Sequence, residues 1–192
     1  MAKIIVMMSM SIDGFIEGPQ REIDWHQVDD EVHSYFNEQL AGMGAFADGR
    51  VTYELMAEYW PTADADPAAS RPVAEFARIW RDKPKYVFSR TLPQADWNTT
   101  VVREVSPATV AAIQAQVDGD LAVGGADLVG EFVRQDLIDE YRLYFHPVAI
   151  GRGKPLFPPD AQVALELIDT RRFSNGLVEL RYRPAPAPPT GG

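Results

Sequence analysis

Apolar residues along the chain follow two spacings, which predict alternating strands and helices. Short continuous or alternating apolar runs, typical of strands, occur at residues 4–8, 45–47, 85–88, 99–103, 121–123 and 141–145. Apolar residues three or four positions apart, typical of amphipathic helices, occur between them at residues 29–43, 50–60, 72–80, 107–117 and 126–133. The alternation predicts an α/β fold whose sheet is mostly parallel and carries helices on both faces.

The C-terminal part of the chain departs from this alternation. Residues 163–167 and 178–182 both alternate between apolar and polar side chains, and a Ser-Asn-Gly turn at residues 174–176 lies between them. This pattern predicts a C-terminal antiparallel hairpin at one edge of the sheet. Residues 61–71 are small and polar and predict a loop, and the glycines of residues 151–155 predict a turn.

The strand predicted at residues 121–123 ends at Gly124-Gly125, and a helix-spaced segment follows directly. Glycines let the backbone pass close to a bound group. The free N–H groups at the start of a helix favour an anion such as a phosphate. A Gly-Gly turn alone is weak evidence, because the same pair also serves turns that bind nothing.

Two further polar clusters follow predicted strand ends. Arg50 and Thr52 come just after Gly49, and Ser89-Arg90 follows the strand at residues 85–88. Guanidinium and hydroxyl groups bind phosphate oxygens well. Because ligands of open α/β sheets lie at the carboxyl ends of the strands, these clusters and the glycine turn are expected to converge on one phosphate-bearing ligand.

Two carboxylates are candidate catalytic groups. Asp13 ends the first strand in an Asp-Gly pair, where it either contacts a ligand or only caps the turn. Asp30 lies in an acidic first helical turn, which the helix dipole favours, and it follows Trp25, so it is a candidate proton donor. Trp25 is the candidate substrate contact, whereas His26 and His33 are expected at polar surface positions.

Composition narrows the classes of function. The chain has 192 residues, 46% hydrophobic and 24% charged, which suits one domain, placed at residues 1–184, with a flexible tail at residues 185–192. Its net charge of −10 argues against a nucleic-acid or anionic membrane surface. The absence of cysteine excludes disulfides, thiolate catalysis and cysteine metal sites, and His146 is too isolated to indicate a metal. No apolar run approaches the roughly 20 residues of a membrane span, so a cytoplasmic protein is expected.

Four segments together resemble the dihydrofolate reductase-like superfamily, in particular the C-terminal reductase domain of the bifunctional riboflavin biosynthesis deaminase-reductase. They are SMSIDGFIEG, DGRVTYE, VFSRTL and VGGADLVGEFVRQDLIDEYRLYFHPVAIGRGKPLF. The segments occur in the order of the family and extend over nearly all of residues 3–183. The resemblance implies an eight-stranded sheet, NADPH as cofactor, and a homodimer formed through the final strands.

The resemblance also implies roles for single residues. Arg50, Val51 and Thr52 match positions at the cofactor phosphates, and Ser89 and Arg90 match positions near the adenosine 2′-phosphate. The positions that match the pyrophosphate-binding turn and helix start are Gly124, Gly125, Ala126, Asp127 and Leu128. Asp13 matches a position close to the nicotinamide and the substrate.

The sequence departs from both branches of the superfamily. Trp25 follows Asp24 instead of the proline of dihydrofolate reductases, and Asp30 lies among other acids instead of in an apolar helix start. The deaminase partner of the riboflavin enzyme needs cysteine, which is absent. We therefore expect an NADPH-dependent oxidoreductase that transfers hydride to a small heterocyclic or sugar-like substrate. The alternatives are dihydrofolate reductase activity and a dinucleotide-binding module without turnover.

Overall fold

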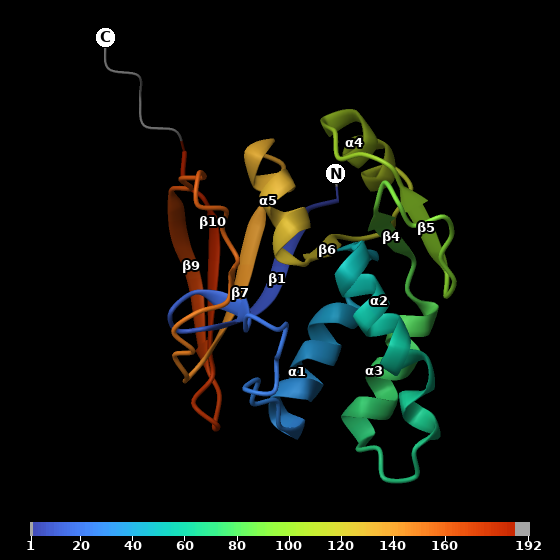
Figure 1. The fold of residues 1–192 in the computed structure, drawn as a ribbon, viewed down its shortest axis with the longest axis vertical. Helices are drawn as coiled ribbons and strands as arrows, with labels where there is room; N and C mark the ends of the chain where they lie inside the picture. Colours follow the sequence, from blue (N-terminus) through green and yellow to red (C-terminus); the bar gives the residue numbers. More distant parts are fainter. Residues whose placement is uncertain (1, 187–192) are drawn as a thin grey trace.

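The computed structural model describes residues 2–186 and contains one large and one small sheet (Figure 1). The large sheet has eight strands in the order β5-β4-β3-β6-β1-β7-β10-β9, and β10 runs antiparallel to both of its neighbours. The predicted mostly parallel sheet and its C-terminal antiparallel hairpin are therefore confirmed. Its strands are β1 (Ile4–Ser11), β3 (Ala45–Gly49), β4 (Lys85–Phe88), β5 (Thr99–Val102), β6 (Leu121–Gly124), β7 (Glu140–His146), β9 (Leu165–Arg172) and β10 (Val178–Pro184).

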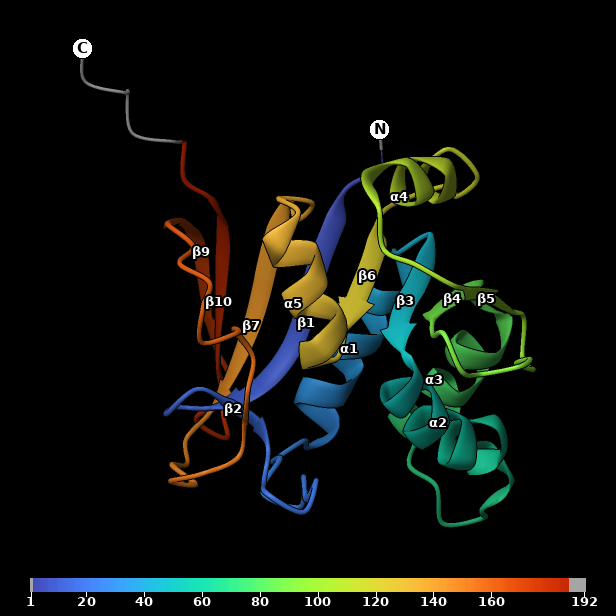
Figure 2. The same ribbon diagram turned by 45° about the horizontal axis from the view of Figure 1, so that its top comes forward.

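Helices cover both faces of this sheet, as predicted. Successive residues of the central strands point to opposite faces, and on both faces these residues are apolar. Val6 packs in a core cluster with residues of α4 and α5, whereas its neighbour Ile5 packs in a second cluster with residues of α2 and α3. Tyr35 of α1 packs with Tyr144 of β7 in a third cluster. Figure 2 shows the helices on either side of the strands. The helices are α1 (Asp30–Ala41), α2 (Arg50–Tyr59), α3 (Arg71–Asp82), α4 (Pro107–Gln114) and α5 (Ala126–Arg134).

The connections of the central strands run in opposite directions. From β1 the chain crosses β6 through α1 to reach β3, and from β6 it crosses β1 through α5 to reach β7. A reversal of this kind leaves room for a ligand at the carboxyl ends of the strands. These ends carry Gly49 and Gly124, where α2 and the turn into α5 begin.

Two segments differ from the sequence prediction. Residues 61–71, predicted as a loop, begin with the 3-10 helix η1 (Trp60–Ala65), whose Pro61 and Ala63 are buried. The loop was predicted from the polarity of this segment, which does not show that Pro61 and Ala63 pack against the rest of the protein. The predicted turn at residues 151–155 leads into β8 (Lys154–Pro155), which pairs with β2 (Phe15–Glu17) to form the small sheet. Neither short strand has an apolar run that would have revealed it.

The described part of the chain ends beside the hairpin. Ala185 donates a backbone hydrogen bond of 2.8 Å to Ala164, so the first residue of the predicted tail lies against the chain before β9. The remainder of the predicted tail, from residue 187 onward, lies outside the described residues. No helix within residues 2–186 is both long and apolar enough to span a bilayer.

Candidate functional site

A cleft of about 540 Å³ opens beside the start of α2 and α5. The structure brings nine of the ten predicted cofactor residues together in its walls, although they come from three separate stretches of the chain. Gly124 is the tenth and faces the neighbouring cavity. The nine residues are Arg50, Val51, Thr52, Ser89, Arg90, Gly125, Ala126, Asp127 and Leu128.

The two helices that begin at this cleft have free N-termini. Gly49 precedes α2 and Gly125 precedes α5, and neither residue can offer a side-chain cap. By contrast, Asp29 caps α1 through the amide of Val32, and Ser106 caps α4 through the amide of Thr109. Uncapped first-turn N–H groups and the helix dipole both favour an anion. The cleft therefore has two helix ends suited to phosphate groups.

Glycine is required at the turn into α5. Gly125 has φ +84°, a left-handed conformation that other residues rarely adopt. A Cβ atom on Gly125 would lie 2.6 Å from Oγ1 of Thr52. The close approach puts the Thr52 hydroxyl next to the N-terminus of α5, so α2 and α5 can bind the same anion.

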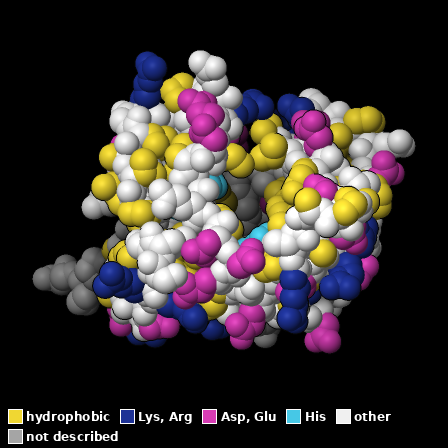
Figure 3. Space-filling view, turned by 90° about the horizontal axis from the view of Figure 1, so that it is seen from below, with side chains coloured by type: hydrophobic (Ala, Val, Ile, Leu, Met, Phe, Trp, Pro, Cys, Tyr) yellow, Lys and Arg dark blue, Asp and Glu magenta, His cyan; other side chains and the backbone are white. Residues whose placement is uncertain are grey.

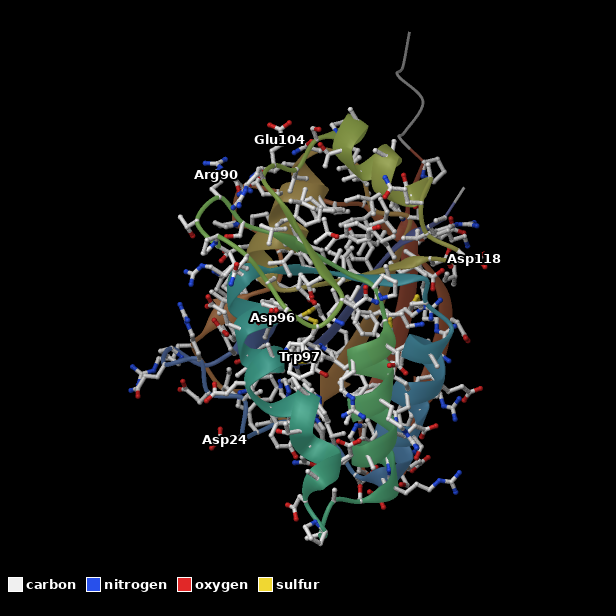
Figure 4. The ribbon with its side chains drawn as sticks, turned by 90° about the vertical axis from the view of Figure 1, so that its right-hand side faces the viewer. Asp24, Arg90, Asp96, Trp97, Glu104 and Asp118 are labelled. Carbon is white, nitrogen blue, oxygen red and sulfur yellow. The ribbon has the colours of Figure 1, made fainter. Side chains whose placement is uncertain are left out.

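The basic side chains of the cleft divide into two kinds. Arg103 donates hydrogen bonds to the carbonyls of Ser89 (3.0 Å) and Leu92 (2.7 Å), so its guanidinium holds the loop after β4. Arg90 is exposed and extends outward on the same side of the molecule as Glu104 (Figure 4). Arg50 is exposed and forms a 2.9 Å ion pair with Glu54, within its own helix. Exposed pairs of this kind contribute little to stability, so Arg50 can leave Glu54 and turn toward an anion at small cost. Arg90 is exposed and can do the same.

Sequence reasoning missed three basic residues of this cleft. Arg21, Arg103 and Lys154 line it, but they come from three separate segments and none follows a predicted strand end together with a helix start. Lys154 forms a 2.5 Å hydrogen bond with Asp127 at the start of α5. For these three residues the only local feature in the sequence was the pair of glycines before Lys154, and these glycines predicted a turn instead of a binding residue.

A second, apolar cavity of about 510 Å³ adjoins the cleft, and Thr52 lines both. Figure 3 shows it as a hollow edged by hydrophobic and histidine side chains. Gly124 and Met8 lie at its boundary with the cleft. Its walls are mainly aromatic and aliphatic: Met7, Ile23, Val28, Phe36, Leu40, Phe46, Met56, Trp60, Phe76, Trp80, Ala122 and Val123.

The carboxyl group of Asp48 lies in the wall of this apolar cavity. Burial raises the pKa of Asp48 to about 7, and the positive charge of Lys85 opposes the rise. Burial also lowers the pKa of Lys85 to about 8, and its ammonium group donates hydrogen bonds to the carbonyls of Trp80 and Lys83. An acid with a pKa near neutrality is suited to exchanging a proton. In the sequence, the only sign of this acid was its position, since Asp48 lies between an apolar run and Gly49.

The two predicted catalytic acids lie elsewhere. Asp13 is exposed, and its carboxylate accepts hydrogen bonds from the amides of Gly151 (2.7 Å) and Ile150 (3.3 Å). Hydrogen bonds from Ser11 and these two amides hold the pKa of Asp13 below its usual value. Asp30 is exposed at the first position of α1, and neither acid lines the cleft or the apolar cavity. In the structure the Asp13 carboxylate therefore ties its own turn to the distant loop at residues 150–151.

Trp25 contacts the histidines beside the apolar cavity instead of lining it. Its ring meets His26 edge-on at 4.2 Å and His146 at 5.8 Å. The two imidazoles stack in parallel, with centroids 4.9 Å apart. His26 and His33, expected at the surface, are partly buried and line the cavity.

His146 is fully buried at the end of β7. Its Nδ1 accepts a 3.0 Å hydrogen bond from the amide of Gln27, which ties the loop before α1 to the sheet. Burial, together with His26, lowers the pKa of His146 to about 4. Within the part of the chain that the structure describes, no group of three or more metal-ligating side chains is arranged around a common point.

Comparison with known proteins gives the family. The family model described as the RibD C-terminal domain matches residues 2–179. The Bacillus subtilis (strain 168) protein YyaP is 34% identical over 182 residues, which are 94% of each chain. A crystal structure of a putative riboflavin biosynthesis protein from Shewanella sp. PV-4 aligns with a TM-score of 0.76 at 22% identity, over 97% of this chain and 100% of that one.

The fold extends to a more distant enzyme. Dihydrofolate reductase from Enterococcus faecalis, complexed with NADP(H) and RAB-propyl, aligns with a TM-score of 0.64 at 12% identity, over 95% of this chain and 96% of that one. Likeness at this identity shows the fold, and the family follows from the match over residues 2–179. The chain belongs to the RibD C-terminal domain family and has the dihydrofolate reductase-like fold.

Proposed function

We propose that the protein is an NADPH-dependent reductase that transfers hydride to a small substrate. The observation that carries this proposal is the junction of two unlike cavities at Thr52 and the Gly124-Gly125 turn. One is a polar cleft, lined by both basic and acidic side chains and by free helix N-termini, and the other is an apolar cavity. A dinucleotide needs a site of the first kind for its phosphates, and a reducible ring needs the second.

The residues of the cleft fit NADPH. The amides at the start of α5 and the hydroxyl of Thr52 are proposed to hold the pyrophosphate, with Arg50 beside them. Ser89 and Arg90 are proposed to bind the adenosine 2′-phosphate, because a guanidinium binds a phosphate through two hydrogen bonds. When bound, NADPH supplies the hydride. The protein positions the cofactor and supplies apolar walls for the substrate.

A thermal-shift comparison of NADPH with NADH tests the cofactor. A ligand that binds only the folded state raises stability by RT ln(1 + [L]/Kd). At equal concentrations we expect a larger rise in Tm with NADPH, because NADH lacks the 2′-phosphate. Equal shifts would contradict the assignment of Ser89 and Arg90, and the absence of any shift would contradict the proposed function.

Turnover is tested separately from binding. The absorbance of NADPH is followed with dihydrofolate, with riboflavin-pathway pyrimidines and with small cyclic imines and ketones. Oxidation with any of these supports a reductase, and oxidation with dihydrofolate alone would favour dihydrofolate reductase activity. A Tm rise with NADPH but no oxidation with any member would favour a dinucleotide-binding module without turnover.

We also propose a homodimer formed through the hairpin. Along β9, Leu167 and Ile168 are half exposed, although both are large apolar residues. A second copy would cover them. Light scattering of the purified protein should give twice the mass of one chain, and Ile168→Glu should shift it toward the monomer. A monomeric wild type would contradict this part of the proposal.

A further inference from the structure

The apolar cavity contains one acid and no strong base in its walls. Among the described residues that line it, none is Lys or Arg. Lys85, whose positive charge acts on Asp48, lies over the ring of Trp80 and donates its hydrogen bonds to backbone carbonyls. A phosphate group in this cavity would lose its water without gaining a cation, which is strongly unfavourable. The cavity therefore disfavours phosphorylated substrates.

The aromatic lining of the cavity favours flat rings. Six aromatic side chains from five separate elements line a volume of about 510 Å³. Aromatic walls bind planar rings through stacked and edge-on contacts. The six are Phe36, Phe46, Trp60, Phe76, Trp80 and Tyr144.

Asp48 lies where such a ring would meet the cofactor. Its Oδ1 packs against Gly124, at 2.9 Å from the position of a Cβ atom there, and Thr52 lines the same wall. Among the described residues, no side chain or amide donates a hydrogen bond to the Asp48 carboxyl group, so the group is left to interact with whatever occupies the cavity. The other titratable side chains that face the cavity are His33 from α1, His26 from the loop before it, and Tyr144 from β7.

We propose, on the basis of the reductase function above, that the substrate is an unphosphorylated flat ring compound with a C=N bond, and that Asp48 is the catalytic residue that protonates its nitrogen. The imine carbon gains the hydride supplied by NADPH, and its nitrogen gains the carboxyl proton of Asp48. The products are the amine, NADP⁺ and an ionised Asp48, which regains its proton from water. The C=N bond becomes a C–N single bond, so charge and electrons balance.

The substrate class is tested by binding to the protein without cofactor. The probes are 2-phenyl-1-pyrroline and the same molecule with a phosphonate on its phenyl ring, and quenching of tryptophan fluorescence reports binding beside Trp60 and Trp80. We expect the phosphonate to bind at least about 100-fold more weakly, because its charge has no partner in the cavity. Equal or tighter binding of the phosphonate, or no binding of the parent imine, would overturn the proposed class.

A gain-of-function variant provides the matched control for this test. Ile23 lines the cavity and is 39% exposed, so a longer basic side chain can extend from the rim. Ile23→Arg should improve binding of the phosphonate about 10-fold or more while changing binding of the parent imine much less. Unchanged binding of the phosphonate would mean that charge is not what excludes it, and would overturn that argument.

The role of Asp48 is tested by NADPH oxidation with 2-phenyl-1-pyrroline between pH 5.5 and 8.5. In the wild type, kcat should fall as the pH rises above about 7, where the carboxyl group ionises. Asp48→Asn should lower kcat at pH 6 at least about 100-fold, the usual size of general acid catalysis, and should abolish this pH dependence. Asp48→Glu should restore part of the activity, and the exposed-surface control Asp118→Asn should behave as the wild type.

The outcomes separate this inference from the proposed function. If NADPH gives no rise in Tm, the reductase function fails, whereas the fluorescence test still reports on the cavity. If the wild type oxidises NADPH with the imine but Asp48→Asn has the same kcat and pH profile, only the role of Asp48 fails. If NADPH binds but its oxidation requires a phosphorylated substrate, the reductase function stands and the substrate class is overturned.

Discussion

The Oδ1 atom of Asp48 lies so close to Gly124 that a Cβ atom on this glycine would meet it at 2.9 Å. Asp48 ends a buried run in β3, and Gly124 ends β6, the neighbouring strand with which β3 pairs in register. The contact therefore places an acid between the sheet and the glycine turn. The following glycine, Gly125, makes a different contact, because a Cβ atom there would meet Thr52 at 2.6 Å.

Substitution of the two glycines should separate these contacts. Gly124→Ala needs only a movement of the Asp48 carboxyl group, so we expect a stability loss of about 1 kcal/mol or less and a clear fall in kcat. Gly125→Ala places a side chain at φ +84° and against Thr52, so it should cost more stability and weaken NADPH binding. Urea unfolding and NADPH titration of both variants make the comparison. A larger stability loss for Gly124→Ala would contradict it.

Asp48 should make stability depend on pH. Its pKa is 3.8 without burial and about 7 in the folded protein, so the folded state binds more protons between these values and stability falls as the pH rises through this range. Asp48→Asn cannot ionise, and its Tm relative to the wild type should therefore be higher at pH 8 than at pH 5. Asp118→Asn should show no such change. A pH-independent difference for Asp48→Asn would contradict a raised pKa.

His146 should make stability depend on pH in the opposite sense. Its folded pKa of about 4 is below its usual 6.5, so the unfolded chain binds more protons in this range and stability falls as the pH drops from about 6.5 toward 4. His146→Gln should reduce this fall, leaving the share of His26, whose pKa burial also lowers. Thermal unfolding between pH 4 and 7 measures the slope. Superimposable slopes for variant and wild type would rule out this role for His146.

Arg90 should determine preference between the two nicotinamide cofactors. Arg90→Ala is expected to weaken NADPH binding about 10-fold, in keeping with the loss of one charged hydrogen-bonding group, and to leave NADH binding nearly unchanged. Arg78→Ala removes an exposed arginine of α3, which lines neither cavity, and should change neither affinity. Fluorescence titration of both cofactors gives the ratio. An equal loss for NADPH and NADH would contradict contact with the 2′-phosphate.

Gly153 should hold the small sheet in place. A Cβ atom on Gly153 would lie 2.1 Å from the carbonyl oxygen of Glu17, so β2 and β8 must separate in Gly153→Ala. We expect a stability loss of about 1–3 kcal/mol, as for other overpacking substitutions, and weaker NADPH binding, because Glu17 and Lys154 line the cleft. Gly151→Ala meets open space and strains only φ, +75°, so it should keep the cleft. Unchanged NADPH binding in Gly153→Ala would contradict this coupling.

The spacing of apolar residues was sufficient to predict the sheet and its hairpin. Residues 4–6 are buried on both faces, and burial on both faces requires the continuous apolar pattern that the sequence shows. The cleft at the strand ends was also predictable in outline, because Gly125, Thr52 and Ser89 all follow strand ends, and the ends of parallel strands meet at one edge.

The tertiary structure alone decided which acid faces the apolar cavity. Asp13, Asp30 and Asp48 all lie at strand or helix ends in the sequence, and each has an ordinary local reason to be there. Only the packing of β3 against β6 and of the aromatic walls around them partly buries Asp48, whereas Asp13 and Asp30 remain exposed. A pKa depends on the solvent and charges that distant segments bring to the group. Local sequence determined the strands and turns, and long-range packing determined the chemistry between them.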